Sequence, residues 1–168
     1  NSISAADFVP WYNGHPDYAS LNLDLSSDTA IVIGAGNVAM DCARMLAVDP
    51  TELEVTDTAE HAIASLKNSK IRKVYICARR GAEFAAFTSP ELRELPDLEH
   101  TNVIISKSEI EGAISRAGEP PDKHVTRNLA AMLNLATNTN HPHQRTMEFL
   151  FQHVPTVING NGKVESRS

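Results

Sequence analysis

The stretch Thr29-Ala-Ile-Val-Ile-Gly-Ala-Gly-Asn-Val-Ala-Met-Asp41 decides the fold of this chain. It opens on a β-branched apolar run, residues 29–33, which predicts a buried strand. Over residues 37–48 the apolar side chains recur at helical spacing, which predicts a helix. Two glycines join the strand to the helix. A strand, a glycine turn and a helix in this order are typical of a dinucleotide-binding βα unit.

The glycine turn follows the pattern Gly34-x-Gly36-x-x-Ala39, in which each named residue has a physical role. Gly34 permits the tight turn out of the strand, Gly36 lets the backbone approach a pyrophosphate, and Ala39 keeps the helix close to the sheet. The helix that begins near Asn37 offers phosphates its unpaired N–H groups and the positive end of its dipole. A glycine turn in an α/β protein of another kind is the alternative.

A second strand, predicted over residues 73–78, is followed directly by Arg79 and Arg80. In dinucleotide-binding folds an acidic residue at this point holds the ribose 2′-hydroxyl of NAD, whereas arginine accommodates the 2′-phosphate of NADP. The usual gap from the glycines is about 20 residues. Here it is much longer, so we interpret residues 49–69, with a helix of their own, as an insertion. The alternative is an arginine pair at a solvated strand end.

The remaining segments continue the α/β pattern, except in three regions where neither helix nor strand is predicted: residues 1–29, 111–122 and the polar loop 138–144. Residues 1–29 are expected to be irregular, with the aromatic cluster of residues 8–12 packed on the domain's own surface. Residues 111–122 are rich in Gly, Glu and Pro and are expected to form a loop. Helices are predicted from Asp57, with Glu60 completing a capping box, from Thr88 or Ser89, and over residues 123–137. Strands are predicted over residues 102–106, 147–151 and 156–158, and a tight turn is predicted over 159–162.

Composition limits the class of protein. The 168 residues fit one domain of common size, and 42% hydrophobic with 21% charged residues is enough for a packed core. A net charge of −6 argues against a general nucleic-acid binder, and no apolar run approaches the roughly 20 residues of a membrane span. Two cysteines cannot form a disulfide framework, which indicates an intracellular protein. Because the first residue is Asn1 and not Met, we expect the chain to come from a longer protein.

The sequence contains no grouping that predicts catalysis by the chain's own side chains. Cys42 falls on the apolar face of a predicted helix and Cys77 within a strand, so both are expected in the core. His141 and His143 lack a third ligand nearby, so no metal site is predicted. Transfer of a hydride would belong to a bound cofactor.

Four segments, taken in order and spacing, resemble adrenodoxin reductase and its bacterial ferredoxin–NADP reductase relatives. They are Phe8-Val-Pro-Trp-Tyr-Asn-Gly14, Gly34-Ala-Gly-Asn-Val-Ala-Met-Asp41, Arg79-Arg-Gly81, and Phe87-Thr with Glu91-Leu-Arg-Glu94. The resemblance implies an α/β fold: a three-layer Rossmann-like NADP-binding domain with a central parallel sheet and additional antiparallel strands. It also implies that residues 1–20 are a lead-in from an FAD-binding domain outside this chain, and that residues 21–168 form the NADP-binding domain.

The resemblance also implies roles for individual residues. The cofactor-binding residues would be Gly34 at the tight turn, Ala35, Gly36, Asn37 and Val38 at the pyrophosphate, Arg79 and Arg80 at the 2′-phosphate, and Glu91 as an acidic contact. Arg93 and Arg127 would face an acidic ferredoxin. Two positions depart from the family: Ala35 replaces a larger polar residue of many relatives, and Asn134 falls near an arginine of the adrenodoxin reductases.

The activity implied by the resemblance is hydride transfer from NADPH to FAD, followed by single-electron transfer to a ferredoxin/adrenodoxin-type iron–sulfur protein. FAD would be bound outside this chain, which lacks a flavin-binding glycine motif, so the isolated chain is expected to be inactive. The alternatives are the NADPH domain of another flavoprotein, such as a glutamate-synthase-like reductase, and a non-catalytic nucleotide-sensing module. The implied location is mitochondrial for a eukaryotic source and cytoplasmic for a bacterial one.

Overall fold

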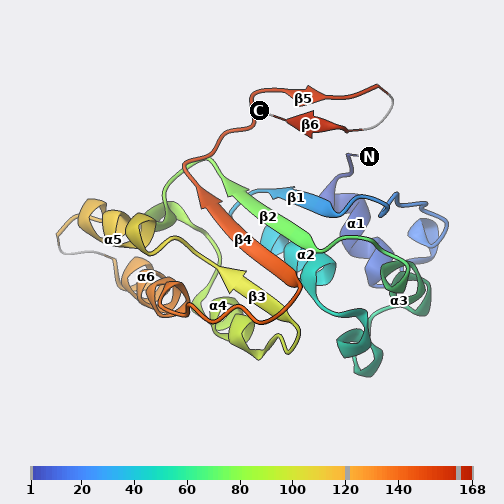
Figure 1. The fold of residues 1–168 in the computed structure, drawn as a ribbon, viewed down its shortest axis with the longest axis horizontal. Helices are drawn as coiled ribbons and strands as arrows, with labels where there is room; N and C mark the ends of the chain where they lie inside the picture. Colours follow the sequence, from blue (N-terminus) through green and yellow to red (C-terminus); the bar gives the residue numbers. More distant parts are fainter. Residues whose placement is uncertain (1, 120–121, 162–163, 168) are drawn as a thin grey trace.

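The computed structural model describes residues 2–119, 122–161 and 164–167, and its centre is a four-stranded parallel sheet (Figure 1). The strands lie in the order β1-β2-β4-β3, with β1 at Thr29–Ile33, β2 at Lys73–Ala78, β3 at Thr101–Ile104 and β4 at Arg145–Phe151. All three strand pairings are parallel, so the carboxyl ends of the strands share one edge and the amino ends the other. The predicted central parallel sheet is confirmed.

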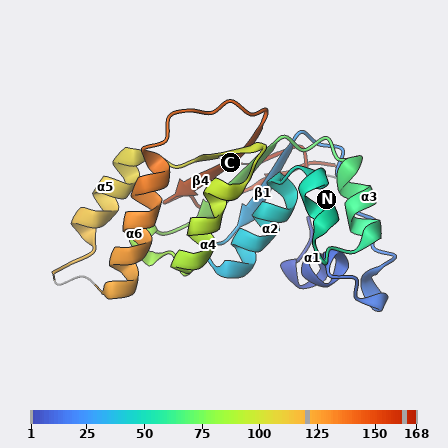
Figure 2. The same ribbon diagram turned by 90° about the horizontal axis from the view of Figure 1, so that it is seen from below.

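The helices lie on one side of this sheet (Figure 2). They are α1 at Ala5–Tyr12, α2 at Asn37–Ala47, α3 at Glu60–Lys67, α4 at Ser89–Glu94, α5 at Lys107–Arg116 and α6 at Lys123–Ala136. Within the described residues the expected three-layer arrangement is therefore wrong. On the face away from the helices, Ile31 and Ile33 remain 36% and 60% exposed.

No antiparallel strand joins the central sheet in the described part of the chain. Where the structure describes the chain, antiparallel pairing is confined to two short strands, β5 at Ile158–Asn159 and β6 at Ser166–Arg167, which lie apart from the sheet (Figure 1). The tight turn predicted over 159–162 lies partly outside the described residues.

The main core fills the space between the sheet and the helices. Every second residue of the central strands points toward the helices, and Val74, Ile76, Met147 and Phe149 are buried there. Met40 of α2 is buried in the same cluster. The central strands therefore contribute one face to this core.

A second core forms where the chain was expected to be irregular. Residues 5–12 fold into α1, because the Ser4 side chain caps the helix by accepting a hydrogen bond from Ala6 N at 3.1 Å. The aromatic cluster does pack on the domain's own surface, as expected, against α2 and α3. Trp11 is 1% exposed and stacks on Phe8 with ring centroids 5.6 Å apart. The helix was missed because Pro10 stands inside it.

Two other expectations about helices are wrong. Residues 107–116 form α5 where a loop was expected from residue 111, because Ser106 caps the segment and Ile110 and Ala113 are buried. The helix expected from Asp57 begins instead at Glu60, after a 3₁₀ helix at Pro50–Val55. Ala59 is its N-cap, so the predicted capping box does not form.

The burial of Trp11 leads to a prediction about stability. Replacing Trp11 by Ala should lower the free energy of unfolding by about 3–5 kcal/mol, because the neighbouring helices cannot close the cavity that remains. Chemical denaturation followed by circular dichroism measures this loss. Val9→Ala, on the half-buried side of the same helix, is the control and should cost about 1 kcal/mol. Equal losses in the two variants would contradict a core centred on Trp11.

Candidate functional site

The glycine turn stands at the carboxyl edge of the sheet, between β1 and α2. Gly34 N donates to Cys77 O of β2 at 2.9 Å, which holds the turn against the neighbouring strand. Gly34 has a φ of +148°, and a Cβ added to it would lie 3.2 Å from Ala39 Cβ. The backbone conformation and the close approach of the helix therefore both require glycine at this position.

Gly36 has the opposite surroundings. A Cβ added to it would meet no atom within 4 Å, so the space beside it is open. Gly36 is the N-cap of α2 and supplies no side-chain hydrogen bond, which leaves the N–H groups of the first turn without a side-chain cap. Val38, in that turn, is 54% exposed. An open backbone surface at a helix amino end suits the binding of an anionic group.

A polar network ties the start of α2 to α4. The Asn37 side chain accepts from Thr88 N at 3.0 Å and donates to a Glu91 carboxylate oxygen at 3.4 Å. Thr88 Oγ1 hydrogen-bonds the other carboxylate oxygen of Glu91. Two residues before Thr88, Ala86 N donates a hydrogen bond to Ala35 O at 2.7 Å. Two predicted cofactor-binding residues, Asn37 and Glu91, are thus in direct contact although 54 positions separate them.

The arginine pair lies at the same carboxyl edge. Arg79 and Arg80 follow β2 directly, and Ile33 pairs with Cys77 in the last register position of β1 and β2. Both arginine side chains are exposed. The Arg80 guanidinium stands 5.1 Å from the centre of the Phe84 ring, and Phe84 is itself 54% exposed. The fold thus brings the glycine turn and the arginine pair to adjacent strand ends.

Gly81 closes the loop behind the arginine pair. A Cβ there would collide with the Glu83 carboxylate, whose side chain is 5% exposed and bonded to Arg116 of α5 at 2.7 Å. Burial raises the pKa of Glu83, but the hydrogen bonds and the charge of Arg116 outweigh it and hold the pKa below its ordinary value. This ion pair, whose carboxylate is buried while the Arg116 side chain is 42% exposed, therefore anchors the loop to the body of the domain.

Charged groups also surround the outer face of α2. Burial raises the pKa of the Asp41 carboxyl, opposed by Arg44 and supported by the negative charges of Glu91 and Glu94. Arg44 is ion-paired with Glu94 at 2.8 Å. The pair joins α2 to α4 and reinforces the contact made through Asn37.

The two residues implied in partner binding are also brought together. Arg93 of α4 and Arg127 of α6 line one hollow of about 320 Å³, which Asn134 also lines. Both arginine side chains are exposed. Two neighbouring cations on an exposed groove provide a surface that attracts acidic groups.

Other candidate chemistry is not assembled in the described part of the chain. No three His, Cys, Asp or Glu residues there come together as a metal site. Cys42 and Cys77 are buried, as expected for core residues. The described helices include none with the length and apolar character needed to cross a bilayer.

Comparison with known proteins agrees with this arrangement. The chain is 42% identical over 164 residues to the NADPH-ferredoxin reductase FprA of Mycobacterium leprae, and 41% identical over 158 residues to the mitochondrial NADPH:adrenodoxin oxidoreductase of Arabidopsis thaliana. These matches cover 98% and 90% of the chain. The chain is homologous to proteins of the ferredoxin/adrenodoxin reductase family, and it matches one part of their length. No family model matches it.

The match to this reductase family extends to the fold. The structure of Mycobacterium tuberculosis FprA in complex with NADPH superimposes with a TM-score of 0.91, at 43% identity, over 98% of this chain. The chain spans about a third of the length of these reductases, 36% for both FprA proteins and 33% for the Arabidopsis protein. The resemblance inferred from the four sequence segments is therefore confirmed.

Sequence reasoning missed two features at the carboxyl edge of the sheet. One is Phe84, beneath Arg80, and the other is the return of residues 85–88 along the glycine turn. The only local sign of that return is the pair of small residues Ala85 and Ala86, which permits a close approach of two backbones. The pairing of Thr88 with Asn37 depends on tertiary structure and has no sequence signal.

The different surroundings of the two glycines give a matched test. Gly34→Ala should lower the free energy of unfolding by about 1–3 kcal/mol, since alanine is strained at this φ and crowds Ala39. Gly36→Ala should change it by no more than about 0.5 kcal/mol, since its Cβ meets open space. Thermal and chemical denaturation measure both. A larger loss for Gly36→Ala than for Gly34→Ala would contradict this geometry.

Proposed function

We propose that this chain is the NADPH-binding part of an FAD-dependent ferredoxin (adrenodoxin)–NADP reductase. The observation that carries the proposal is the meeting of an open glycine turn with an exposed arginine pair at one sheet edge. The similarity to FprA, which has been solved in complex with NADPH, supports the same cofactor.

The residues at this edge fit a dinucleotide phosphate. Ala35 to Val38 offer backbone N–H groups at the start of α2, and the free space beside Gly36 allows a pyrophosphate to approach the main chain. Arg79 and Arg80 would hold the 2′-phosphate through charge-assisted hydrogen bonds. Glu91, fixed by Asn37 and Thr88, would contact the cofactor from α4.

FAD belongs to the proposed function but not to the described site. The chain has one glycine turn of the dinucleotide-binding kind, and we assign it to NADP. We place residues 1–20 as the lead-in from an FAD-binding domain and residues 21–168 as the NADP-binding domain. When bound, FAD would accept the hydride of NADPH and supply the single-electron chemistry. We propose no catalytic side chain in this chain for these steps.

The partner would be a ferredoxin- or adrenodoxin-type iron–sulfur protein, docking on the hollow lined by Arg93 and Arg127. A mitochondrial or bacterial cytoplasmic location follows from the same proposal. The NADPH domain of a glutamate-synthase-like reductase is less well supported, because the relatives carry ferredoxin and adrenodoxin reductase names. A nucleotide-sensing module is distinguished by the absence of NADPH oxidation in the full-length protein.

Cofactor choice tests the arginine pair. The full-length protein should prefer NADP to NAD by roughly 30- to 1000-fold, because the 2′-phosphate makes charge-assisted hydrogen bonds that NAD lacks. Replacing both Arg79 and Arg80 by Ala should raise the Kd for NADP and leave that for NAD nearly unchanged. Calorimetry at two salt concentrations measures this, and the preference should shrink at high salt.

Two controls separate the arginine pair from other contributions. Gly36→Ala should weaken NADP and NAD alike, since it blocks the pyrophosphate common to both. Ala at both Arg93 and Arg127, which removes the same charge elsewhere, should leave the preference intact. If the Arg79 and Arg80 variant retained its NADP preference, the assignment of the 2′-phosphate to this pair would fail.

Charge reversal tests the partner surface. In the full-length protein, Arg93→Glu should slow ferredoxin reduction and leave reduction of a small dye unchanged, because exposed interfacial charges act mainly on association rate. Steady-state assays with both acceptors measure the difference. Lys70→Glu, an equal charge change at an exposed position before β2 that does not line this hollow, is the control and should behave as wild type. Parallel loss of both activities in Arg93→Glu would rule out a role confined to the partner.

A further inference from the structure

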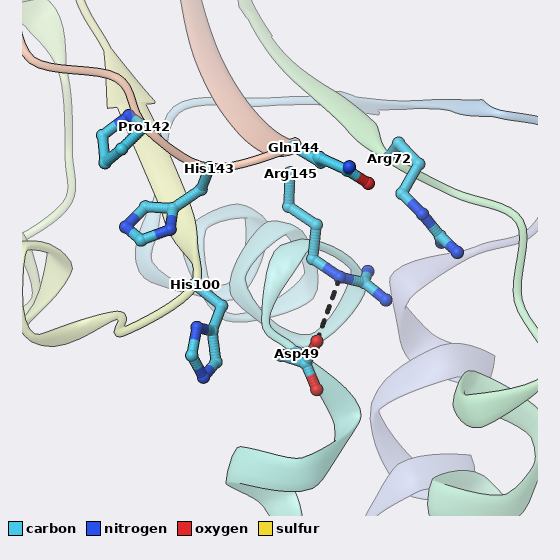
Figure 3. Close-up of a pocket in the computed structure, with 7 residues that line it drawn as sticks. All are labelled: Asp49, Arg72, His100, Pro142, His143, Gln144 and Arg145. Carbon is cyan, nitrogen blue, oxygen red and sulfur yellow. Dashed lines mark ion pairs between the residues drawn. The ribbon is translucent and has the colours of Figure 1, made fainter.

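A second polar site lies at the amino edge of the sheet, opposite the glycine turn. Arg72 directly precedes β2, His100 precedes β3, and Gln144 and Arg145 lie where β4 begins. Together with Asp49 and His143 they line a cavity of about 390 Å³ (Figure 3). Because Arg72 and Arg79 stand at opposite ends of β2, this cavity is separate from the proposed cofactor edge.

The cavity wall is rich in hydrogen-bond donors. The Arg145 side chain is only 12% exposed; its Nη1 donates to Ile71 O at 3.2 Å, and its Nε lies 3.6 Å from Asp49 Oδ2. Arg72 Nη1 donates hydrogen bonds to Ser69 O at 3.1 Å and to Ile71 O at 2.7 Å. Among the described residues, no acceptor is found for the remaining guanidinium N–H groups of either arginine.

The two arginines act on each other. Burial lowers the pKa of Arg145, and the neighbouring positive charge of Arg72 lowers it further, against the opposing effects of Asp49 and Glu52. An anion between the guanidiniums would relieve this repulsion. On the opposite wall His100 and His143 lie edge to face, with ring centroids 6.0 Å apart.

The nearby carboxylates do not use up the donors. Asp49 Oδ1 is occupied by Thr51, which donates from N at 3.0 Å and from Oγ1 at 2.7 Å. Glu52 does not line the cavity. One of its oxygens accepts from Glu99 N, and the other is buried and has no hydrogen-bond partner among the described residues. The negative charges of Asp49 and Glu52 offset the positive charges of the two arginines. The cavity therefore has an excess of hydrogen-bond donors rather than of positive charge.

We propose that this cavity binds a phosphate group, carried by a small phosphate monoester or present as free phosphate. Phosphate oxygens accept paired N–H bonds from guanidinium groups and single bonds from imidazole and amide N–H groups. The volume lies at the lower end of the range of small-molecule sites, which suits a compact ligand. A metal is not favoured, since the described residues contain no group of three metal-ligating side chains.

The test is a titration of the full-length protein read at the imidazoles of His100 and His143 by ¹H–¹⁵N NMR. NADP⁺ is first added to saturation, so that phosphate cannot report on the proposed 2′-phosphate contacts. Inorganic phosphate, glycerol 3-phosphate and succinate are then added in parallel at constant ionic strength. We expect saturable shifts of both imidazoles with phosphate, with glycerol 3-phosphate or with both, and weaker ones with succinate.

Matched variants locate the binding. Arg72→Gln should weaken phosphate binding about tenfold, the loss of one charge-assisted contact. His143→Ala should weaken it by a smaller factor, and it keeps the proposal testable if Arg72→Gln does not fold. His141→Ala, in the same loop but outside the cavity, and Lys70→Gln, beside Arg72 in sequence, should bind as wild type.

Three results would overturn the proposal: no saturable shift with either phosphate, equal losses in the control variants, or succinate binding as tight as phosphate. Preference for glycerol 3-phosphate would identify a monoester as the ligand, and equal or tighter binding of inorganic phosphate would identify free phosphate. The proposal is independent of the proposed function. If NADP⁺ did not bind, the His100 and His143 signals would still report on this cavity alone.

Discussion

The close approach of Gly34 to Ala39 is the constraint on which the rest of the structure depends. A side chain at Gly34 would meet Ala39 at 3.2 Å, in a backbone conformation that glycine tolerates better than other residues. This contact allows α2 to leave β1 sharply and to pack its apolar face on the sheet. It also directs the amino end of α2 toward the carboxyl edge, where Gly36 leaves the backbone open.

The remaining features of that edge build on this turn. The segment after β2 returns along it, held by the bond from Ala86 N to Ala35 O and by the Asn37 contacts with Thr88 and Glu91. The Glu83–Arg116 ion pair anchors the same segment from behind. As a result, the arginine pair and Glu91 are placed around the helix start by contacts remote in sequence. The opposite edge brings together a different set of arginines and histidines, because all four strands of the central sheet begin there.

The sequence predicted those parts of the molecule that depend on local patterns. Strands β1 and β2 are short apolar runs rich in β-branched residues, helix α2 has apolar residues at helical spacing, and the glycine turn has a spacing with a physical meaning. Helix α1 was missed because Pro10 is normally a breaker, while its stability comes from burying Trp11 against α2 and α3. The amino-edge cavity was invisible for a similar reason, since Arg72, His100 and Arg145 meet only when β4 inserts between β2 and β3.

The most direct measurement of the central claim is a crystal structure of the full-length protein with NADP⁺. The account predicts the pyrophosphate against the backbone of residues 34–38, beside the open space at Gly36, with the 2′-phosphate between the guanidinium groups of Arg79 and Arg80. Glu91 should keep its bonds to Asn37 and Thr88. A pyrophosphate bound away from the glycine turn, or a 2′-phosphate without contact to either arginine, would contradict it.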